Sequence, residues 1–347
     1  MRKTISEVAQ YIKSIVPPEP GETVVFKPVL KKIASPESFR DGIASCRDFL
    51  FQMYDSLIAE GKAYDTSKKT AHEYENRISL SVYYPFLDNL KNLLMKIGYH
   101  GAFADGHSLV CDNNIFDKRL SVAKSLECLR FLTTCGLCFD GVDLDKKKQN
   151  LSDIRTVTVR HLNAPAVMTG FKVMSMAEAE LGTLANQDIF LRCDYRALQN
   201  GETDIVMVVR ETIRPLPKEV QEFVLQLHER YSDSGVVCVI EIKGFHIYIK
   251  YCYKRKDVWG INASLNNGCH INVKAVKTQE YKDTIHTFPP FLQEMIAKGY
   301  GCGRKREIGR CDGGCRGLII PLDDSVLDYR DYITKWFDTE LSCLRRK

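Results

Sequence analysis

The sequence predicts an α+β protein with a helix-rich N-terminal region and a C-terminal antiparallel sheet that is flanked by helices and carries a Cys-rich loop. Apolar residues recur at helical spacing through much of the N-terminal part, whereas they alternate along several short segments after residue 235. The chain has 347 residues, 44% of them hydrophobic and 27% charged, which fits two ordinary globular domains. We expect an N-terminal helix and Pro-rich arm over residues 1–34, a mixed helical and α+β domain over 35–210, and an α+β domain over 211–347.

Capping and breaker residues set the expected elements of the N-terminal part. A helix is expected over 36–60 behind the capping residue Ser35, and another over 85–97 with Gly98 as its stop. The pair Asp105-Gly106 lies between alternating apolar residues and predicts a two-residue hairpin. The other expected elements are helices from about Arg119 to Thr134 and from Pro165 to near Gly182, and strands near Val157 and Phe190.

The C-terminal part has the clearest pattern. Pro217 opens a helix, and Ser325 is expected to cap the last one, which should bury Tyr329, Ile333, Trp336 and Leu341. A further helix is broken at Pro289-Pro290. The expected strands run over 236–242, 245–253, 258–263, 270–276 and 318–321.

The loop from Gly299 to Gly317 holds three cysteines, five basic residues and seven glycines. Two thiolates a few residues apart in a turn can reach one zinc ion, which takes four N or S ligands. We expect a structural zinc site with the ligands Cys302, Cys311, Cys315 and Cys269; His270, His286 and Cys343 are alternatives for the fourth position. Reduced thiols without a metal are an equally good interpretation, and redox chemistry is a weaker one.

Cys311-Asp-Gly-Gly-Cys315, followed by a strand and an aromatic-rich helix, resembles an uncharacterised bacterial family of clostridial type. The resemblance covers about the last 130 residues. It implies an α+β fold and a cytoplasmic bacterial setting, and it implies no activity.

Nucleic-acid binding is the main alternative function. The net charge of +5 neither requires nor excludes such a partner, but basic residues gather in the Cys loop, in one strand tip and in the tail Arg345 to Lys347. The candidate contact residues are Arg304, Lys305, Arg306, Arg310, Arg316, Lys254, Arg255 and Lys256. In the strand before that tip, Phe245, Ile247, Ile249, Tyr251 and Tyr253 share one face, which we interpret as a core face rather than a base-stacking platform.

Catalytic motifs give little support to an enzyme, so this class stays open but is less expected than binding. The sequence has no Walker, G-x-S-x-G, HExxH or dinucleotide-binding motif. The Cys135-x-x-Cys138 pair follows a helix C-terminus, where a thiolate is disfavoured, and we expect His228 on the polar side of its helix. Thirteen cysteines without a signal peptide or membrane span predict a cytoplasmic protein with reduced thiols. Its function is expected to be binding of an unknown small molecule or macromolecule.

Overall fold

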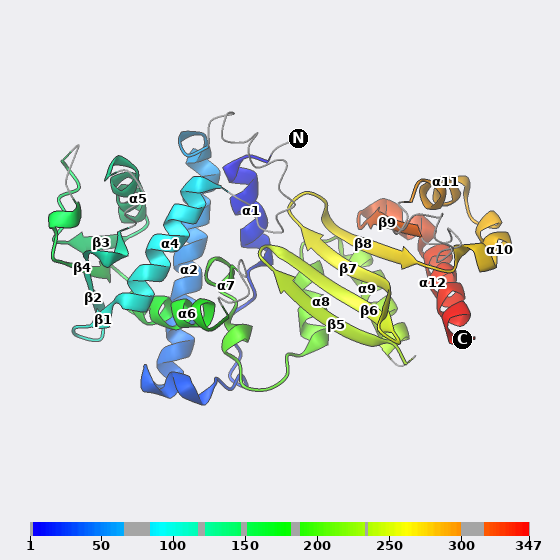
Figure 1. Ribbon diagram of the computed structural model, residues 1–347, viewed down its shortest axis with the longest axis horizontal. Coiled ribbons are helices and arrows are strands. Elements are labelled where there is room, and N and C mark those ends of the chain that lie inside the picture. The colour runs from blue at the N-terminus through cyan, green and yellow to red at the C-terminus, as the bar shows by residue number, and fades with distance from the viewer. Residues whose placement is uncertain are drawn as a thin grey trace, which may run out of the picture. The chain divides into compact units, whose positions relative to one another are not determined.

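The computed structural model (Figure 1) describes residues 3–65, 84–116, 122–146, 151–181, 188–232, 235–299 and 316–346. It confirms the α+β fold, with helices and antiparallel sheets. The chain divides into two compact units. Unit 1 comprises Met1–Thr203 and Lys243–Phe245, and unit 2 comprises Asp204–Ile242 and His246–Lys347. The segment expected as a separate arm, residues 1–34, is therefore part of unit 1.

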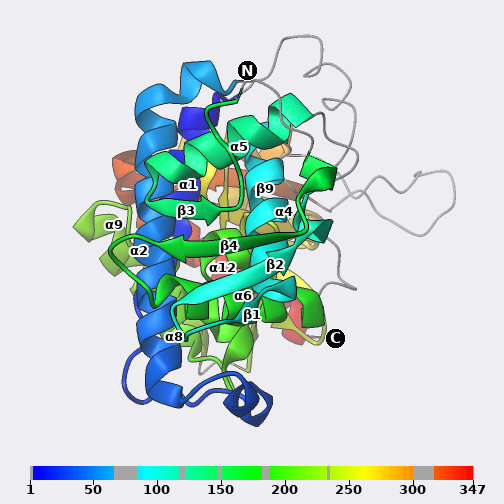
Figure 2. The same ribbon diagram turned by 90° about the vertical axis from the view of Figure 1, so that its left-hand side faces the viewer.

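Unit 1 combines a helical core with a small antiparallel sheet. Its strands lie in the order β1-β2-β4-β3, as Figure 2 shows. The helices are α1 (Ile5–Ile15), α2 (Pro36–Glu60), α4 (Pro85–His100), α5 (Val122–Thr134), α6 (Val167–Leu181) and α7 (Ile189–Arg192), and the strands are β1 (Ala102–Phe103), β2 (Ser108–Asp112), β3 (Leu137–Asp140) and β4 (Thr156–His161). The expected hairpin forms, but its connection spans residues 104–107 and is longer than the two residues expected. Gly106 has a φ of 79°, and the Asp105 carboxylate accepts from the backbone amide of His107.

Helix α2 forms as its sequence predicts. The Ser35 hydroxyl accepts from the amide of Ser38 at 3.2 Å, and Pro36 occupies the first turn. One apolar stripe of the helix is buried along its length: Phe39, Ile43, Cys46, Leu50, Met53 and Leu57. The helix therefore contributes one continuous face to the core of unit 1.

Close helix contacts through glycine organise that core. A Cβ atom on Gly170 of α6 would lie 2.1 Å from the carbonyl oxygen of Gly42 on α2. Gly98 of α4 was expected to end its helix, but the helix continues to His100, and Gly98 instead packs against the Phe171 carbonyl of α6. Sequence spacing alone cannot separate a glycine that ends a helix from one that admits a neighbouring helix.

The strand expected near Phe190 is wrong, because this segment forms the short helix α7. Its apolar residues are buried, and the Glu178 carboxylate accepts from the amide of Phe190 at 3.0 Å. Residues with positive φ angles, Asp188 and Cys193, lie at the two ends of the helix. A short buried apolar run has no period that distinguishes a strand from a helix.

Unit 2 contains a five-stranded antiparallel sheet in the order β5-β6-β7-β8-β9, and β5 to β8 are seen side by side in Figure 1. The strands are β5 (Val237–Lys243), β6 (His246–Tyr253), β7 (Lys256–Ser264), β8 (Gly268–Ala275) and β9 (Arg316–Pro321), and the helices are α8 (Ile205–Ile213), α9 (Lys218–Ser232), α10 (Lys282–His286), α11 (Pro290–Lys298) and α12 (Arg330–Arg345). All five expected strands are present. Helix α8, which begins at the capping residue Asp204, was not foreseen.

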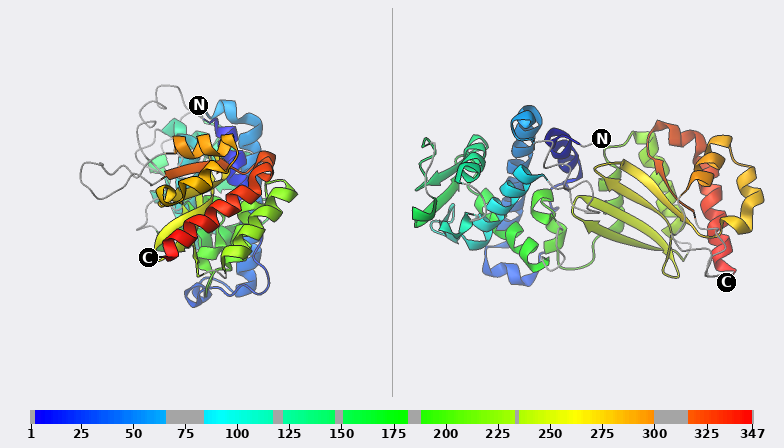
Figure 3. Two further views of the ribbon diagram at one scale, coloured as in Figure 1. Left: turned by 90° about the vertical axis from the view of Figure 1, so that its right-hand side faces the viewer. Right: turned by 45° about the horizontal axis from the view of Figure 1, so that its top comes forward.

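Helices α9 and α12 cover one face of this sheet, and they lie next to each other in Figure 3. Ile247, Ile249 and Tyr251 of β6 are buried on that face, which confirms the core interpretation for these residues. Tyr253, beyond the register shift at Tyr251 and Cys252, is only half-buried. Ser325 does not cap α12. Asp323 caps a short 3₁₀ segment before it, through the amide of Ser325, and α12 begins at Arg330.

No helix in the described ranges is long and apolar enough to cross a lipid bilayer.

The Gly42–Gly170 contact yields the first prediction. We expect Gly170→Ala to lower the free energy of unfolding by about 1–3 kcal/mol, because the new methyl group would displace the α2 backbone. Urea unfolding followed by circular dichroism measures this change. Gly21→Ala is the control, since its Cβ would meet only Thr23, at 3.9 Å, and a change within about 0.5 kcal/mol is expected. A Gly170→Ala protein as stable as the wild type would contradict the proposed packing.

Candidate nucleic-acid interface

The turn between β6 and β7 has an unusual backbone for its sequence. Tyr253 pairs with Lys256, so Lys254 and Arg255 form a two-residue loop, with φ angles of 46° and 65°. Two positive φ angles in succession define the turn that normally carries Asn-Gly. For residues with a side chain beyond glycine this conformation costs about 1–2 kcal/mol each. The turn therefore holds two cationic side chains at an energetic cost.

The C-terminus of α12 brings further cations to this turn. The Arg345 guanidinium carbon lies 6.0 Å from the centre of the Tyr253 ring, and the Lys254 ammonium lies 5.4 Å from the same point. Arg346 follows directly in sequence. We call the five residues Lys254, Arg255, Lys256, Arg345 and Arg346 the basic tip.

The charges of the turn differ from those on the rest of the sheet. Lys254, Arg255 and Lys256 are exposed, and no carboxylate of the described residues lies within ion-pair distance of them. Lys250, farther along β6, pairs with Glu241 at 2.7 Å, and Asp257, the residue after Lys256, pairs with Lys274. The three cations of the turn thus pair with no carboxylate of the described residues, although Asp257 stands next to them in the sequence.

The face of the sheet opposite α9 and α12 carries polar side chains. The Tyr248 hydroxyl lies 3.2 Å from His246 Nδ1, and the two rings are stacked. Burial lowers the pKa of His246, and nearby His270 lowers it further, so the charged form of this imidazole is disfavoured. With Lys250 already paired, this face contributes little net charge.

His228 is not on the polar side of its helix, as the sequence had suggested. It is buried, its Nδ1 lies 2.7 Å from the Tyr251 hydroxyl, and burial lowers its pKa. This histidine fixes α9 to the sheet. A sequence pattern that counts histidine as polar misses a ring that shares a buried hydrogen bond.

The predicted zinc ligands are described only in part. Cys302, Cys311 and Cys315 lie outside the described residues. Cys269 lies near the start of β8, where burial raises the pKa of its thiol to about 12. Its sulfur lies 4.0 Å from the Thr212 carbonyl oxygen. Within the described ranges, no three His, Cys, Asp or Glu side chains are grouped so that they could hold a metal ion.

The sheet register separates Cys269 from the point where the Cys loop joins β9. Arg316 pairs with Ala275 at the far end of β8, six residues from Cys269 and therefore about 20 Å away. That end of β8 lies beside the start of β7. The backbone of Arg316 is therefore at the same end of the strands as the basic tip. Arg304, Lys305, Arg306 and Arg310 lie outside the described residues.

The other described cysteines are free thiols, and most of them are buried. Cys135 is buried and its thiol pKa is raised by burial, which supports the interpretation of the Cys135-x-x-Cys138 pair as structural. Cys46 and Cys193 are also fully buried, and their thiols interact with each other.

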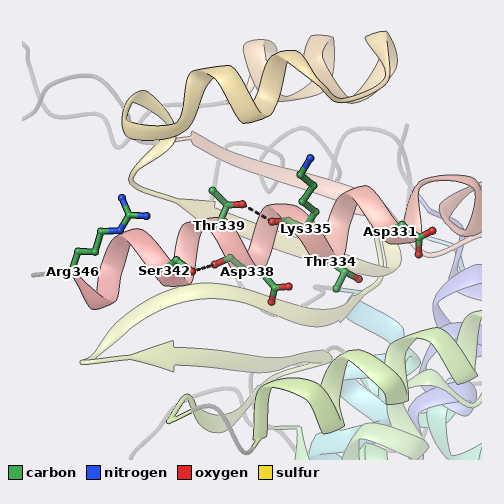
Figure 4. A pocket seen from close by; sticks show the side chains of 7 residues that line it. All are labelled: Asp331, Thr334, Lys335, Asp338, Thr339, Ser342 and Arg346. Atoms are coloured by element: carbon green, nitrogen blue, oxygen red, sulfur yellow. Dashed lines mark hydrogen bonds between the residues drawn. The ribbon is translucent and has the colours of Figure 1, made fainter.

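A groove of about 480 Å³ runs along α12, and Figure 4 shows that one helix supplies its lining: Asp331, Thr334, Lys335, Asp338, Thr339, Ser342 and Arg346. The hydroxyls of Thr339 and Ser342 donate to the carbonyls of Lys335 and Asp338, both at 2.7 Å. Asp338 is paired with Arg230 at 2.6 Å. The residues that line this groove form the solvent-facing stripe of the amphipathic helix α12. The stripe ends at Arg346, which belongs to the basic tip.

Comparisons with models of protein families, with curated proteins and with solved structures found no match.

Proposed function

We propose that unit 2 binds nucleic acid through the basic tip, with its lysines and arginines against the phosphate backbone. The observation that carries this proposal is the Lys254-Arg255 turn, whose backbone favours glycine and asparagine but whose residues are cationic. Residues held in costly backbone conformations gather at functional sites, where selection for a task outweighs stability.

The arrangement suits a chain of phosphates. Its cations come from two elements, the β6–β7 turn and the end of α12, and one from each, Lys254 and Arg345, lies over the ring of Tyr253. Cations spread over an edge can each contact a different phosphate and release its counterions, which is the main source of sequence-independent affinity. Contacts of this kind position a duplex or a single strand without reading its bases.

We retain the structural zinc site as a second proposal. It is supported by the composition of the loop, with Cys302, Cys311 and Cys315 among glycines, and by the entry of that loop into the sheet at Arg316. A zinc ion there would fix the basic loop residues at the same end of the strands as the basic tip. Cys269, in its buried position at the other end of β8, is then the ligand that most needs testing.

The strained turn gives a prediction that separates stability from function. We expect Lys254→Asn/Arg255→Gly to raise the free energy of unfolding by about 1–2 kcal/mol, because the new residues fit the positive φ angles. The same variant should bind nucleic acid on the order of tenfold more weakly, since two phosphate contacts are lost. Urea unfolding and fluorescence anisotropy with a labelled oligonucleotide measure the two effects.

The control is Lys282→Ala/Lys298→Ala, which removes the same charge from two other exposed positions of unit 2. It should leave the affinity within about twofold of the wild type, as expected when only the net charge changes. Equal losses in the two variants would show a nonspecific charge effect and would overturn the proposal. A Lys254→Asn/Arg255→Gly protein that binds as well as the wild type would do the same.

The zinc proposal is tested by elemental mass spectrometry of untagged protein that was purified without chelator. We expect about one zinc per chain in the wild type and none in Cys311→Ser/Cys315→Ser, since structural zinc requires its full ligand set. The variant Cys269→Ser tests the fourth ligand separately. No zinc in the wild type would end the proposal, and unchanged zinc in Cys269→Ser would exclude that residue as a ligand.

A further inference from the structure

A second group of charged side chains lies in unit 1, where α4, α6 and α7 meet. Lys91 Nζ lies 3.3 Å from Glu178 Oε1 and also donates to Asp188 Oδ1. The side chains of Lys91, Glu178 and Asp188 are only 13%, 8% and 7% exposed. Asp88 lies one turn before Lys91 on α4. The ion-paired centre of the cluster therefore holds two carboxyl groups and one amine in a largely water-excluded place, and the half-buried Asp88 adds a third carboxyl group from the same helix as Lys91.

The charges around Asp88 come from each helix of this junction. Lys91 belongs to α4 itself, Glu178 to α6 and Asp188 to the start of α7. Arg192 of α7 is buried close by, but its guanidinium donates to Asp194 at 3.3 Å. Among the described residues, Lys91 alone is within ion-pair distance of Glu178 and Asp188, so it cannot balance a third carboxylate.

The cluster also holds the backbone of α7. Asp188 has a φ of 49°, a conformation that costs energy unless other contacts fix it. Those contacts are the ion pair of Asp188 with Lys91 and, two residues later, the hydrogen bond from the Phe190 amide to the Glu178 carboxylate at 3.0 Å. Any change that draws Lys91 away from Asp188 weakens the start of α7.

We propose that this cluster is a proton-operated switch, in which a proton on Asp88 leaves Lys91 bound to Asp188, and its loss draws Lys91 towards Asp88 and loosens α7. Burial, and after it the charge of Asp188, raises the pKa of Asp88 from 3.8 to about 7. Because the folded value lies above the unfolded one, folding takes up a proton between these values. The stabilising effect is full at low pH and is lost as the pH rises through about 7.

The test is amide hydrogen exchange of the full chain, with wild type and Asp88→Asn compared at equal pH so that intrinsic exchange rates cancel. Asparagine has the shape of the protonated carboxyl group. At pH 5.5 we expect equal exchange in the peptides that cover 188–198. At pH 8.5 these peptides should exchange about tenfold or more faster in the wild type than in Asp88→Asn.

Two further variants make the result decisive. Asp41→Asn, at an exposed position of α2 in the same unit, should behave as the wild type at both pH values. Asp188→Asn tolerates the positive φ but removes the carboxylate to which Lys91 is bound, so α7 should exchange faster than in the wild type at pH 5.5 as well. Equal exchange of α7 in wild type and Asp88→Asn at pH 8.5, or the same effect in Asp41→Asn, would overturn the proposal.

Discussion

The basic tip depends on one stack of aromatic rings between α12 and the sheet of unit 2. The rings of Tyr251 and Trp259 are stacked with their centres 3.8 Å apart, and Phe337 of α12 stacks on Trp259 at 5.1 Å. Such buried rings contribute most of the apolar area of a small sheet core. The stack fixes the line along which α12 crosses the strands, and that line carries the end of the helix to the β6–β7 turn.

A buried carboxylate fixes the same helix at a second point. Glu340 accepts from the amides of Val276 and Lys277, at 2.8 Å and 3.2 Å, and from the hydroxyl of Tyr281. Two attachments determine both the position and the rotation of α12. Arg345, one turn beyond Glu340, therefore reaches Tyr253 in a defined orientation, and the tip is a consequence of core packing rather than of a flexible tail.

The two sites of the protein share one backbone property, which is a positive φ angle at residues other than glycine. The described residues other than glycine with positive φ angles are Asp188, Cys193, Lys254 and Arg255. One pair lies at the ends of α7, beside the buried carboxyl cluster, and the other forms the basic tip. Asp188, Lys254 and Arg255 are charged residues at positions where glycine or asparagine would relieve the backbone, and Cys193 is a buried thiol. The first pair is supported by burial, whereas Lys254 and Arg255 are exposed.

Much of the fold could be predicted from the sequence, because its signals are local. Ser35 and Pro36 mark the start of α2, Asp105-Gly106 marks a hairpin, and alternation marks the strands of unit 2. Three of the failures share a cause: Gly98, His228 and the segment at Phe190 are explained by contacts with residues far away in the sequence. The strand tip and the tail were each identified as basic, but no local pattern could show that Tyr253 and Arg345 meet.

The salt dependence of affinity tests the central claim most directly. Dissociation constants of the wild type for a duplex and for a single-stranded oligonucleotide should be measured between about 50 and 200 mM salt, where counterion release is readily resolved. If phosphates contact two to five cations of the tip, the logarithm of affinity should fall against the logarithm of salt with a slope of about −2 to −4.5 for the duplex. A slope near zero, or no binding at the lowest salt, would contradict the account.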